Sequence, residues 1–338
     1  MPFDEFATYR EIKSQTQAWA QALEMSRQAR LPAAEHYDQV IFTGCGSTFY
    51  LSLAAAALYQ QLTGRIARAI PAGELLLNSD TILTKQKILL IAISRSGTTT
   101  ETIKAVEKFK AGKYGEVLVI SNYAETLSRL ADASIMIPAG QEESVAQTRS
   151  FASMYVAACA IAVRMAGRQD LLEHMTVLPE IGIRMMENFE AVARQIGENL
   201  DYNSFYFLGS GIRYGLACET NLKMKEMTLT HSEPFHFLEF RHGPMSMVNE
   251  NTMVIGLVSE SNFEHESKVL KEMSVLGGRI VSLGESNVDI PFQSGIPEIV
   301  RGVLYLPVLQ LMGFYRALVK GLNPDRPTNL VSVIKLDL

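Results

Sequence analysis

The chain has 338 residues, which is long enough for two ordinary domains with a substantial core. Hydrophobic residues make up 47% and charged residues 20%, a composition typical of a globular protein and unlike that of a disordered or membrane protein. The net charge is −5 and no polybasic run occurs, so we expect no nucleic-acid partner.

The three cysteines are Cys45, Cys159 and Cys218, widely separated and in apolar surroundings. This pattern predicts reduced, buried thiols in a cytoplasmic protein rather than a disulfide framework. The acidic, polar start at Met1–Glu5 predicts no signal peptide. Charged or turn residues interrupt the longest apolar stretches before about 18 positions, so we expect no membrane partner or span.

In chain order, a long polar helix is expected first, over 4–31, and Pro32 ends it. Strands are then expected over 39–42, 87–94, 117–120 and 134–137, and helices over 51–62, 99–109 and 145–166. The strand over 87–94 is almost continuously apolar, as a parallel strand covered on both faces requires. The alternation predicts an α/β sheet with right-handed crossovers.

The second half repeats this plan after a helical connector over 168–200. Phe207–Gly211 repeats the strand end and Gly-x-Gly turn of Phe42–Gly46, 165 positions later, and the same offset carries Lys87–Ser94 onto Thr252–Ser259. One offset that aligns two separate strands predicts two tandem copies of one α/β unit. The second copy is completed by a strand over 279–283 and a helix over 296–318.

The two copies differ in the loop after their second strand. Copy one reads SRSGTTTE over Ser94–Glu101, whereas copy two reads SESNFE over Ser259–Glu264 and lacks the glycine and the hydroxyl cluster. Ligands of open parallel sheets bind beyond the carboxyl ends of the strands. A loop of Ser, Gly and Thr that opens a helix offers N–H groups, hydroxyls and the positive helix end to an anion. We therefore favour a phosphate site over the alternative, an ordinary helix-capping box.

Nucleotide and metal sites are poorly supported by the sequence. Gly44-Cys45-Gly46 lacks the third glycine of a dinucleotide fingerprint, and no Walker motif occurs. His231 and His236 are five positions apart and have no flanking cysteine pair. We expect no metal and no cofactor.

The most densely charged stretch is Glu219–Pro244. Glu219, Lys223 and Glu226 are spaced i, i+4 and i+7, so a helix would place them on one face. From Ser232-Glu233-Pro234 onward we expect an irregular run that ends in Arg241-His242-Gly243-Pro244. A carboxylate on a rigid helix and a histidine on a loop suit proton transfer. The alternative is a solvated, salt-bridged helix followed by a surface loop.

Several of these motifs occur together and in order, and together they resemble the sugar isomerase (SIS) domain family. They are the two sheet units, the SRSGTT loop, the KMKE helix followed by HGP, and the closing segment Lys320–Leu330. The likeness covers about residue 38 to the end. It is closest to the isomerase half of glucosamine-6-phosphate synthases and to stand-alone relatives that act on amino-sugar or fructosamine phosphates.

The fold that this resemblance implies is α/β, with two tandem SIS domains, each a parallel-sheet three-layer α/β/α sandwich of flavodoxin-like or Rossmann-like type. The expected boundaries are an N-terminal helix over 1–34, SIS domain 1 over 35–168, a helical connector over 169–200, and SIS domain 2 with a C-terminal tail over 201–338.

The resemblance also implies roles for individual residues. Glu226 matches the base that moves a proton between C1 and C2, and His242 the ring-opening histidine that the neighbouring subunit supplies. Lys223 matches the helix lysine near that base, and Lys320 the lysine of the C-terminal tail. The residues expected to contact the sugar phosphate are Ser47, Thr48, Ser94, Arg95, Ser96, Thr99 and, through its backbone, Val145.

Two departures from the synthases matter. The chain begins Met1-Pro2 where a synthase has a catalytic cysteine on a glutaminase domain, so we expect no glutamine hydrolysis. Arg95 replaces a glutamine, and Gln147 replaces a serine next to an acidic segment, Gln141–Ser144, so the amine end of the sugar is expected to differ.

The expected function is that of a phosphosugar isomerase or deaminase acting on a hexosamine 6-phosphate, in a homodimer with a shared active site. A carboxylate among apolar residues can have the pKa needed to move a carbon-bound proton, and histidine suits ring opening near neutral pH. Two alternatives stay open: a deglycase for fructosamine or amino-acid-adduct 6-phosphates, and a non-catalytic regulator that senses sugar phosphates.

Overall fold

The computed structural model describes residues 2–331, 333 and 336, so part of the expected C-terminal tail lies outside the described residues. The chain forms two compact units, each with its own sheet. The first-sheet unit comprises Ser14–Glu142, Gln147–Thr176 and Val331–Leu338, and the second-sheet unit comprises Met1–Lys13, Glu143–Ala146 and Val177–Leu330. Helix α1 (Ala7–Gln28) contributes residues to both units.

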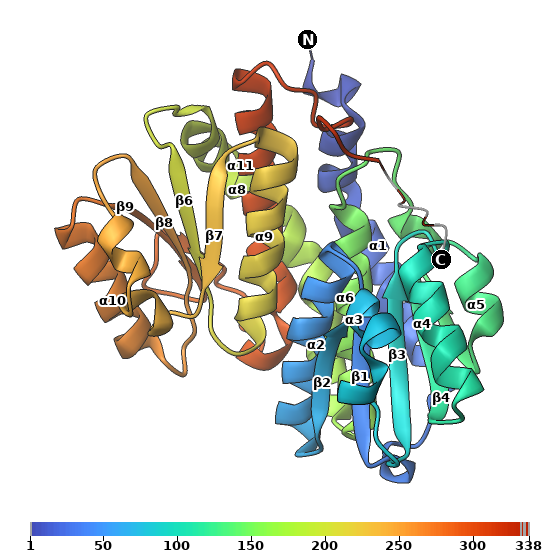
Figure 1. The fold of residues 1–338 in the computed structure, drawn as a ribbon. Helices are drawn as coiled ribbons and strands as arrows, with labels where there is room; N and C mark the ends of the chain where they lie inside the picture. The colour runs from blue at the N-terminus through green and yellow to red at the C-terminus, as the bar shows by residue number, and fades with distance from the viewer. Residues whose placement is uncertain (1, 332, 334–335, 337–338) are drawn as a thin grey trace. The chain divides into compact units, whose positions relative to one another are not determined.

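The first sheet is parallel throughout, with the order β2-β1-β3-β4-β5 (Figure 1). Its strands are β1 (Gln39–Gly44), β2 (Ala67–Pro71), β3 (Ile88–Ser94), β4 (Gly115–Ser121) and β5 (Ala133–Met136). Every residue of β1 and β3 is buried, which explains the apolar runs at 40–42 and 88–93.

Helices cover both faces of the first sheet. On one face, alternate residues of β3 and β4 pack with residues of α3 (Ala72–Leu77), α4 (Thr100–Ala111) and α5 (Thr126–Leu130). The other face is covered by α2 (Ser47–Thr63) and α6 (Arg149–Met165), which pack against each other. A short helix, α7 (Gln169–His174), follows α6.

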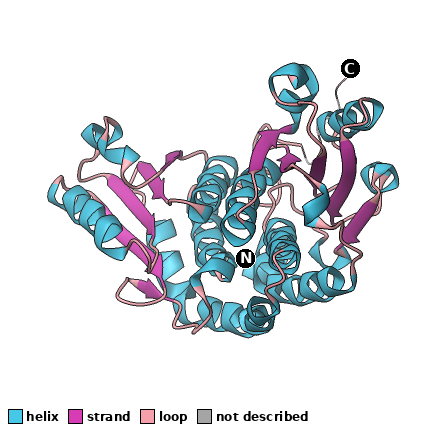
Figure 2. Ribbon diagram, turned by 90° about the horizontal axis from the view of Figure 1, so that it is seen from below, coloured by secondary structure: helices cyan, strands magenta, loops and turns pink. Residues whose placement is uncertain are grey.

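The second sheet is also parallel throughout, with the order β10-β9-β8-β6-β7. Its strands are β6 (Ser204–Leu208), β7 (His231–Phe235), β8 (Thr252–Leu257), β9 (Arg279–Gly284) and β10 (Ile290–Pro291). The helices of this unit are α8 (Leu178–Glu198), α9 (Ile212–Thr228), α10 (Phe263–Val275) and α11 (Leu306–Val319). Figure 2 shows the strands of both sheets with helices alongside them.

The structure confirms the internal repeat. Helices α2 and α9 each have 17 residues, and both their first and last residues are 165 positions apart. Each helix is preceded by a glycine with positive φ: Gly46 at φ 55° and ψ −123°, and Gly211 at φ 58° and ψ −128°. The two sheets also share one strand order, since β2-β1-β3-β4-β5 corresponds to β7-β6-β8-β9-β10.

The expectation of an irregular run was wrong for its first part, because His231–Phe235 forms strand β7, whereas 236–243 is irregular apart from the 3-10 turn Glu239–Arg241. Pro234 lies within this strand, opposite Phe207 of β6. A proline is tolerated there because β7 is an edge strand, so one side of it makes no ladder bonds. Strands β2 and β10 were also not predicted.

Several helices begin or end at other residues than expected, among them α2, which begins at Ser47 rather than 51. Helix α1 occupies Ala7–Gln28 rather than 4–31, and α11 begins only at Leu306, after the 3-10 turns Glu298–Val300 and Gly302–Tyr305. Helix α6 begins at Arg149 rather than 145. The Glu142 carboxylate accepts the N–H groups of Thr148 and Ser150, which fixes that start.

One segment, Gly302–Val319, has the length and apolar composition of a membrane span, contrary to the expectation from the sequence. Of that segment 89% is buried within the protein, as in a core helix. The three cysteines are free; Cys159 and Cys218 are buried, and Cys45 is half-buried. Burial raises the pKa of the Cys45 thiol.

Candidate functional site

The hydroxyl-rich loop after β3 is a compact turn. Ser94 is buried at the end of the strand, and its Oγ accepts the N–H of Gly97 at 3.1 Å. Gly97 has φ +66°, and a Cβ there would lie 3.1 Å from the Cβ of Glu125, so glycine is required. Ser96 Oγ accepts both the N–H and the hydroxyl of Thr98, at 3.2 and 3.1 Å. The loop therefore holds its hydroxyl groups in a fixed arrangement.

The alternative of an ordinary capping box is not supported. Thr99 is the N-cap of α4, and in the part of the chain that the structure describes its side chain makes no capping hydrogen bond. Its Oγ1 lies instead 3.4 Å from Ser94 Oγ. The first helical bond runs from the Ile103 N–H to the Thr99 carbonyl. The positive end of α4 therefore faces the loop without a side-chain cap.

Ser47 and Thr48 lie at the same edge of the first sheet. They open α2 directly after β1, the strand that pairs with β3. The Thr48 hydroxyl donates to the Cys45 carbonyl and accepts the Cys45 N–H, both at 2.9 Å. These bonds stabilise the turn between β1 and α2. The structure thus places Ser47, Thr48 and the loop from Ser94 to Thr99 on neighbouring strand ends, as expected.

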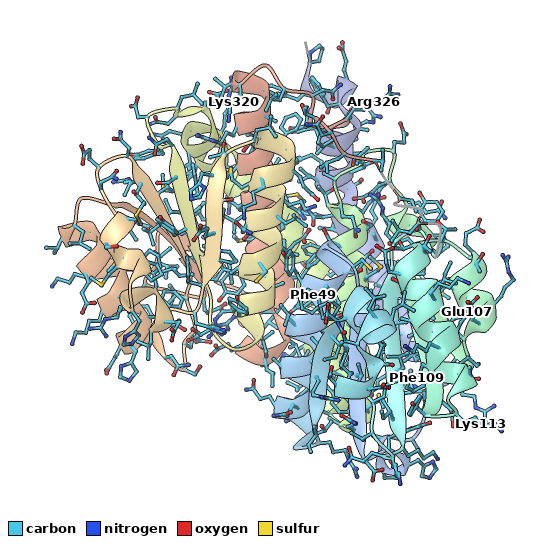
Figure 3. All side chains as sticks on the ribbon, viewed as in Figure 1. Phe49, Glu107, Phe109, Lys113, Lys320 and Arg326 are labelled. Carbon is cyan, nitrogen blue, oxygen red and sulfur yellow. The ribbon has the colours of Figure 1, made fainter. Side chains whose placement is uncertain are left out.

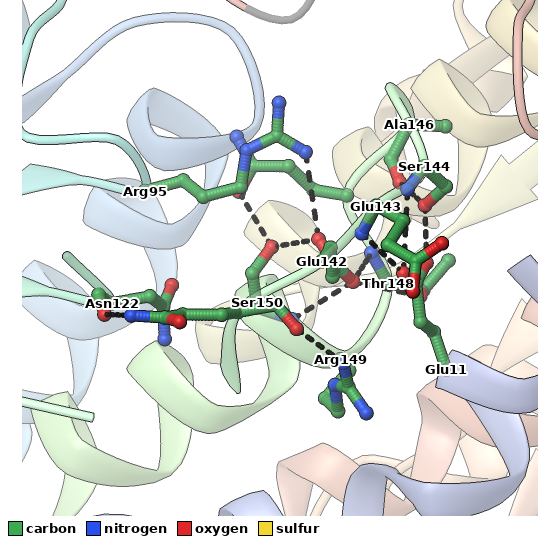
Figure 4. Close-up of polar contacts among 12 residues, drawn as sticks. Glu11, Arg95, Asn122, Glu142, Glu143, Ser144, Ala146, Thr148, Arg149 and Ser150 are labelled. Atoms are coloured by element: carbon green, nitrogen blue, oxygen red, sulfur yellow. Dashed lines mark hydrogen bonds and ion pairs between the residues drawn. The ribbon is translucent and has the colours of Figure 1, made fainter. Parts of the chain in front are cut away.

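Arg95 is fixed at both its backbone and its side chain. Its carbonyl accepts the Asn122 N–H and the Ser121 hydroxyl, each at 3.2 Å. Its side chain is nearly buried, and Nη1 lies 3.5 Å from Oε2 of Glu142, whose side chain is fully buried (Figure 4). The loop thus carries a cation that is paired within the same unit.

The charged face of α9 is buried, so the alternative of a solvated, salt-bridged helix is wrong for this segment. The side chains of Glu219 and Lys223 are 1% and 3% exposed, and that of Glu226 is 20% exposed. Lys223 Nζ lies 3.4 Å from Glu219 Oε1 and also donates to Glu226 Oε2. The predicted i, i+4, i+7 face is confirmed, and it presents one partly accessible carboxylate held by a buried lysine.

Lys320 lies near the C-terminal end of α9. It follows α11 directly (Figure 3), and its Nζ donates to the Leu229 carbonyl and to Thr230 Oγ1, both at 3.2 Å. Leu229 is the residue after α9, with φ 49°, and Glu226 is in the last turn of that helix. Burial and the nearby Arg316 lower the pKa of Lys320. The structure therefore brings Lys320 and Glu226 to the same end of one helix.

His242 lies elsewhere in the same unit. His236 stacks on Tyr214 in the first turn of α9, with ring centroids 3.9 Å apart, and Glu226 lies 12 residues further along that helix, about 18 Å away. Phe240 packs among Val269, Leu270 and Met273 of α10, on the face of the second sheet that carries Tyr206. His242 follows Phe240 by two residues and is exposed.

Helix α9 belongs to the opposite face of that sheet. Phe205 neighbours Tyr206 in β6 and points the other way, toward Arg316 of α11, with which α9 packs. Within one chain, His242 and Glu226 are thus separated by the second sheet and by most of the length of α9.

Val145 is held by its backbone. Its N–H donates to the Asp325 carbonyl at 3.0 Å. The neighbouring Ser144 donates to the buried carboxylate of Glu11, and Ala146 packs against Met227 and Ala317. The amide of Val145 is therefore engaged by the turn that follows α11, and a backbone contact with the sugar stays a prediction for this residue.

The equivalent place in the second copy is filled by protein groups. Ser259 is 165 positions after Ser94, and its Oγ likewise accepts the N–H three residues on, from Asn262, at 3.0 Å. Here, however, the Ser259 N–H and hydroxyl donate to Oε2 of Glu266 at 2.6 and 2.9 Å. Arg213, which corresponds to Thr48, lies 3.3 Å from Oε1 of Glu266. In copy two, an internal carboxylate thus accepts the N–H and hydroxyl of the serine that corresponds to Ser94.

Sequence reasoning did not identify the roles of Glu142 and Glu266. Both are buried carboxylates that accept backbone N–H groups and face an arginine: Glu142 binds the start of α6, and Glu266 binds Ser259 in the loop after β8. The one available signal was an acid a few residues from a helix start, which is too common to identify either residue.

Comparison with known proteins agrees with this architecture. A family model described as SIS domain matches residues 35–164 and 200–290. The chain is 29% identical over 319 residues to glutamine–fructose-6-phosphate aminotransferase (isomerizing) of Pyrococcus horikoshii. This alignment covers 89% of the present chain and 52% of that protein. The chain therefore spans about half the length of the curated relatives it matches.

Solved structures of similar proteins span the whole fold. The crystal structure of glucosamine-6-phosphate deaminase from Thermotoga maritima is 27% identical, with a TM-score of 0.82, and covers 98% of this chain and 100% of that one. Tagatose-6-phosphate ketose/aldose isomerase from Escherichia coli is 21% identical, with a TM-score of 0.81 and coverage of 98% and 97%; this likeness shows the fold alone. The chain, with its matched segments in both halves, belongs to the SIS domain family.

Proposed function

We propose that the protein is an enzyme that acts on a hexosamine 6-phosphate and releases ammonia and a ketose 6-phosphate. The observation that carries the proposal is the ion-paired carboxylate of Glu226. Its partner Lys223 is buried, so the carboxylate is held in one place while a fifth of its side chain stays accessible. A base for carbon-bound protons needs this combination of fixed orientation and access.

The phosphate group binds the loop of Ser94, Ser96 and Thr99 in this proposal. Support comes from the glycine-dependent turn, the positive end of α4 and the arginine that the loop carries. Ser47 and Thr48 lie on the neighbouring strand end and complete the polar surroundings.

The chemistry is a proton shift followed by hydrolysis. In the open-chain aldose, Glu226 removes the proton on C2, and the electron pair moves to form an enolamine. The C1 oxygen takes up a proton as the enolamine forms, and return of the C2 proton to C1 with loss of one N–H proton gives a ketose imine. Addition of water to C2 then releases ammonia and leaves the ketone, so the overall reaction consumes one water. Lys223 holds the Glu226 carboxylate in one orientation, and Lys320, at the same end of α9, is the predicted cation beside the sugar.

His242 opens the pyranose ring in this scheme. Because the second sheet separates it from Glu226 within one chain, we propose that His242 of one subunit serves the Glu226 site of the other. This requires a homodimer with a shared active site.

The relatives support the reaction class but leave the leaving amine open. The similar protein from Thermotoga maritima is called a glucosamine-6-phosphate deaminase, and this name favours ammonia over an amino acid as the product. We further propose that the enzyme works in the cytoplasm, where its three free thiols stay reduced. Cell fractionation with an antibody against the protein tests that location.

Substrate trials test the function. The purified protein is incubated with glucosamine, galactosamine and mannosamine 6-phosphates and with fructosamine and other amino-acid-adduct 6-phosphates. Ammonia, amino acid and ketose phosphate are then measured. Release of ammonia with a ketose phosphate supports the proposal. Release of a free amino acid instead identifies a deglycase, and binding without turnover identifies a sensor.

A further inference from the structure

The Glu142 carboxylate connects a helix start to the proposed phosphate loop. Its Oε1 accepts the N–H and the hydroxyl of Thr148, each at 2.8 Å, and the N–H of Ser150 at 3.0 Å. Its Oε2 accepts the hydroxyl of Ser150 and faces Nη1 of Arg95 (Figure 4). All these residues belong to the first-sheet unit.

The two carboxylate oxygens of Glu142 have different partners. Oε1 satisfies N–H groups at the start of α6, and a neutral amide oxygen could do the same. Oε2 is the oxygen that faces a formal charge. Arg95 is nearly buried, and a buried guanidinium requires an opposite charge, which Glu142 supplies.

The contact between Arg95 and Glu142 orients the guanidinium without forming a short, tight ion pair. The Arg95 backbone is fixed by Ser121 and Asn122, so the direction of its side chain depends on what the guanidinium meets. The distance of 3.5 Å to Glu142 is longer than the 2.7–2.9 Å of a tight charge-assisted bond. The contact with Glu142 therefore sets the direction of the Arg95 side chain.

We propose that Glu142 is a positioning residue: it aims Arg95 so that the guanidinium meets the phosphate held by the Ser94–Thr99 loop, and thereby sets substrate affinity. This inference rests on the proposed function, because the contact between Arg95 and the substrate is part of that proposal. Glu142, in the segment before α6, is 47 positions from Arg95 in the sequence, so its role depends on the folded structure.

The test is a double-mutant cycle. Glu142→Gln keeps an oxygen for the start of α6 and removes the charge that faces Arg95. In wild-type background we expect it to raise KM for glucosamine 6-phosphate on the order of tenfold to a hundredfold with kcat nearly unchanged. In an Arg95→Gln background it should raise KM no further, since no guanidinium is left to position.

Thr148→Val is the matched control. It removes a hydroxyl donor of the same carboxylate on the side away from Arg95, so it should lower Tm and leave KM unchanged. If Glu142→Gln does not fold, Glu142→Asp, which keeps the charge on a shorter side chain, is taken through the same two backgrounds. An equal KM change with and without Arg95 would show a purely structural role and overturn the proposal.

Inorganic phosphate separates this inference from the proposed function. Its affinity, measured by calorimetry, should fall for Glu142→Gln and for Arg95→Gln and should not fall further for the double variant. That result supports the positioning role even where no hexosamine 6-phosphate is turned over. Equal phosphate affinity in wild type and Glu142→Gln overturns the positioning role, whatever the enzyme's activity.

Discussion

Glu226 is in the last turn of α9, whereas Phe240, two residues before the exposed His242, packs with α10 on the other face of the second sheet, although only 16 positions separate Glu226 from His242. Strand β7, which lies between them in the sequence, forms one edge of that sheet. If both residues act on one sugar, they must come from different chains.

Mixed dimers test this arrangement. Chains with Glu226→Gln and chains with His242→Asn should each be inactive alone, but their mixture should regain about a quarter of wild-type activity. With random pairing, half of the dimers are mixed, and each mixed dimer has one intact site. Activity is measured after co-expression with two different tags. No recovery in purified mixed dimers would mean that each site is built from a single chain.

Ser94 and Ser259 are equivalent serines with different expected roles. Ser94→Ala should raise the Kd for glucosamine 6-phosphate about tenfold or more, because one hydrogen bond to a charged phosphate is lost. Ser259→Ala is the matched control and should leave the Kd unchanged, since Glu266 occupies that place. Calorimetry should give one phosphosugar per chain. Two sites per chain, or equal effects of both variants, would contradict the assignment.

The buried triad on α9 makes a prediction about stability. Lys223→Met should lower the free energy of unfolding by about 3 kcal/mol, because the buried Glu219 then lacks its cation. The double variant Glu219→Gln/Lys223→Met should recover part of this loss. Urea unfolding measures both values. If the loss of the double variant relative to wild type equals the sum of the losses of Glu219→Gln and Lys223→Met, the pair is not coupled.

Glu190 should contribute stability that depends on pH. Burial raises the pKa of this carboxyl, but hydrogen bonds from Lys13, Tyr315 and Tyr9 outweigh burial, so the net pKa lies below the ordinary 4.5. A lowered folded-state pKa gives stability that is full above 4.5 and is lost as the pH falls through the folded-state value.

The variant Glu190→Gln isolates this contribution. It should lower the free energy of unfolding by about 1 to 2 kcal/mol at pH 7. The difference from wild type should shrink as the pH falls below 4.5, as followed by urea unfolding at several pH values. A difference that stays constant down to pH 3 would contradict the role of the charge.

Much of the fold could be predicted from sequence periodicity. The buried strands β1, β3, β6 and β8 are short apolar runs, and the shared offset of 165 positions predicted the duplication. Strands β2 and β7 were not predicted because both are half-buried edge strands without a continuous apolar run. Proline in β7 and arginine in β2 further obscured the strand pattern.

The candidate site was predictable where its residues are close in sequence. The spacing of Glu219, Lys223 and Glu226 predicted their shared helix face. The Ser, Gly and Thr content of Ser94–Thr99 predicted a phosphate-binding loop. The pairing of Arg95 with Glu142 could not be predicted, because their contact depends on how the segment before α6 folds back onto the loop. The separation of His242 from Glu226 likewise follows from strand order, which local patterns do not encode.

The proton shift itself is tested most directly by following glucosamine 6-phosphate by NMR in the presence of wild-type protein and of Glu226→Gln. The account predicts that wild type forms a ketose 6-phosphate and ammonia, and that Glu226→Gln binds the sugar but reacts at least a hundredfold more slowly. Product formation by Glu226→Gln at the wild-type rate would contradict the central role of this carboxylate.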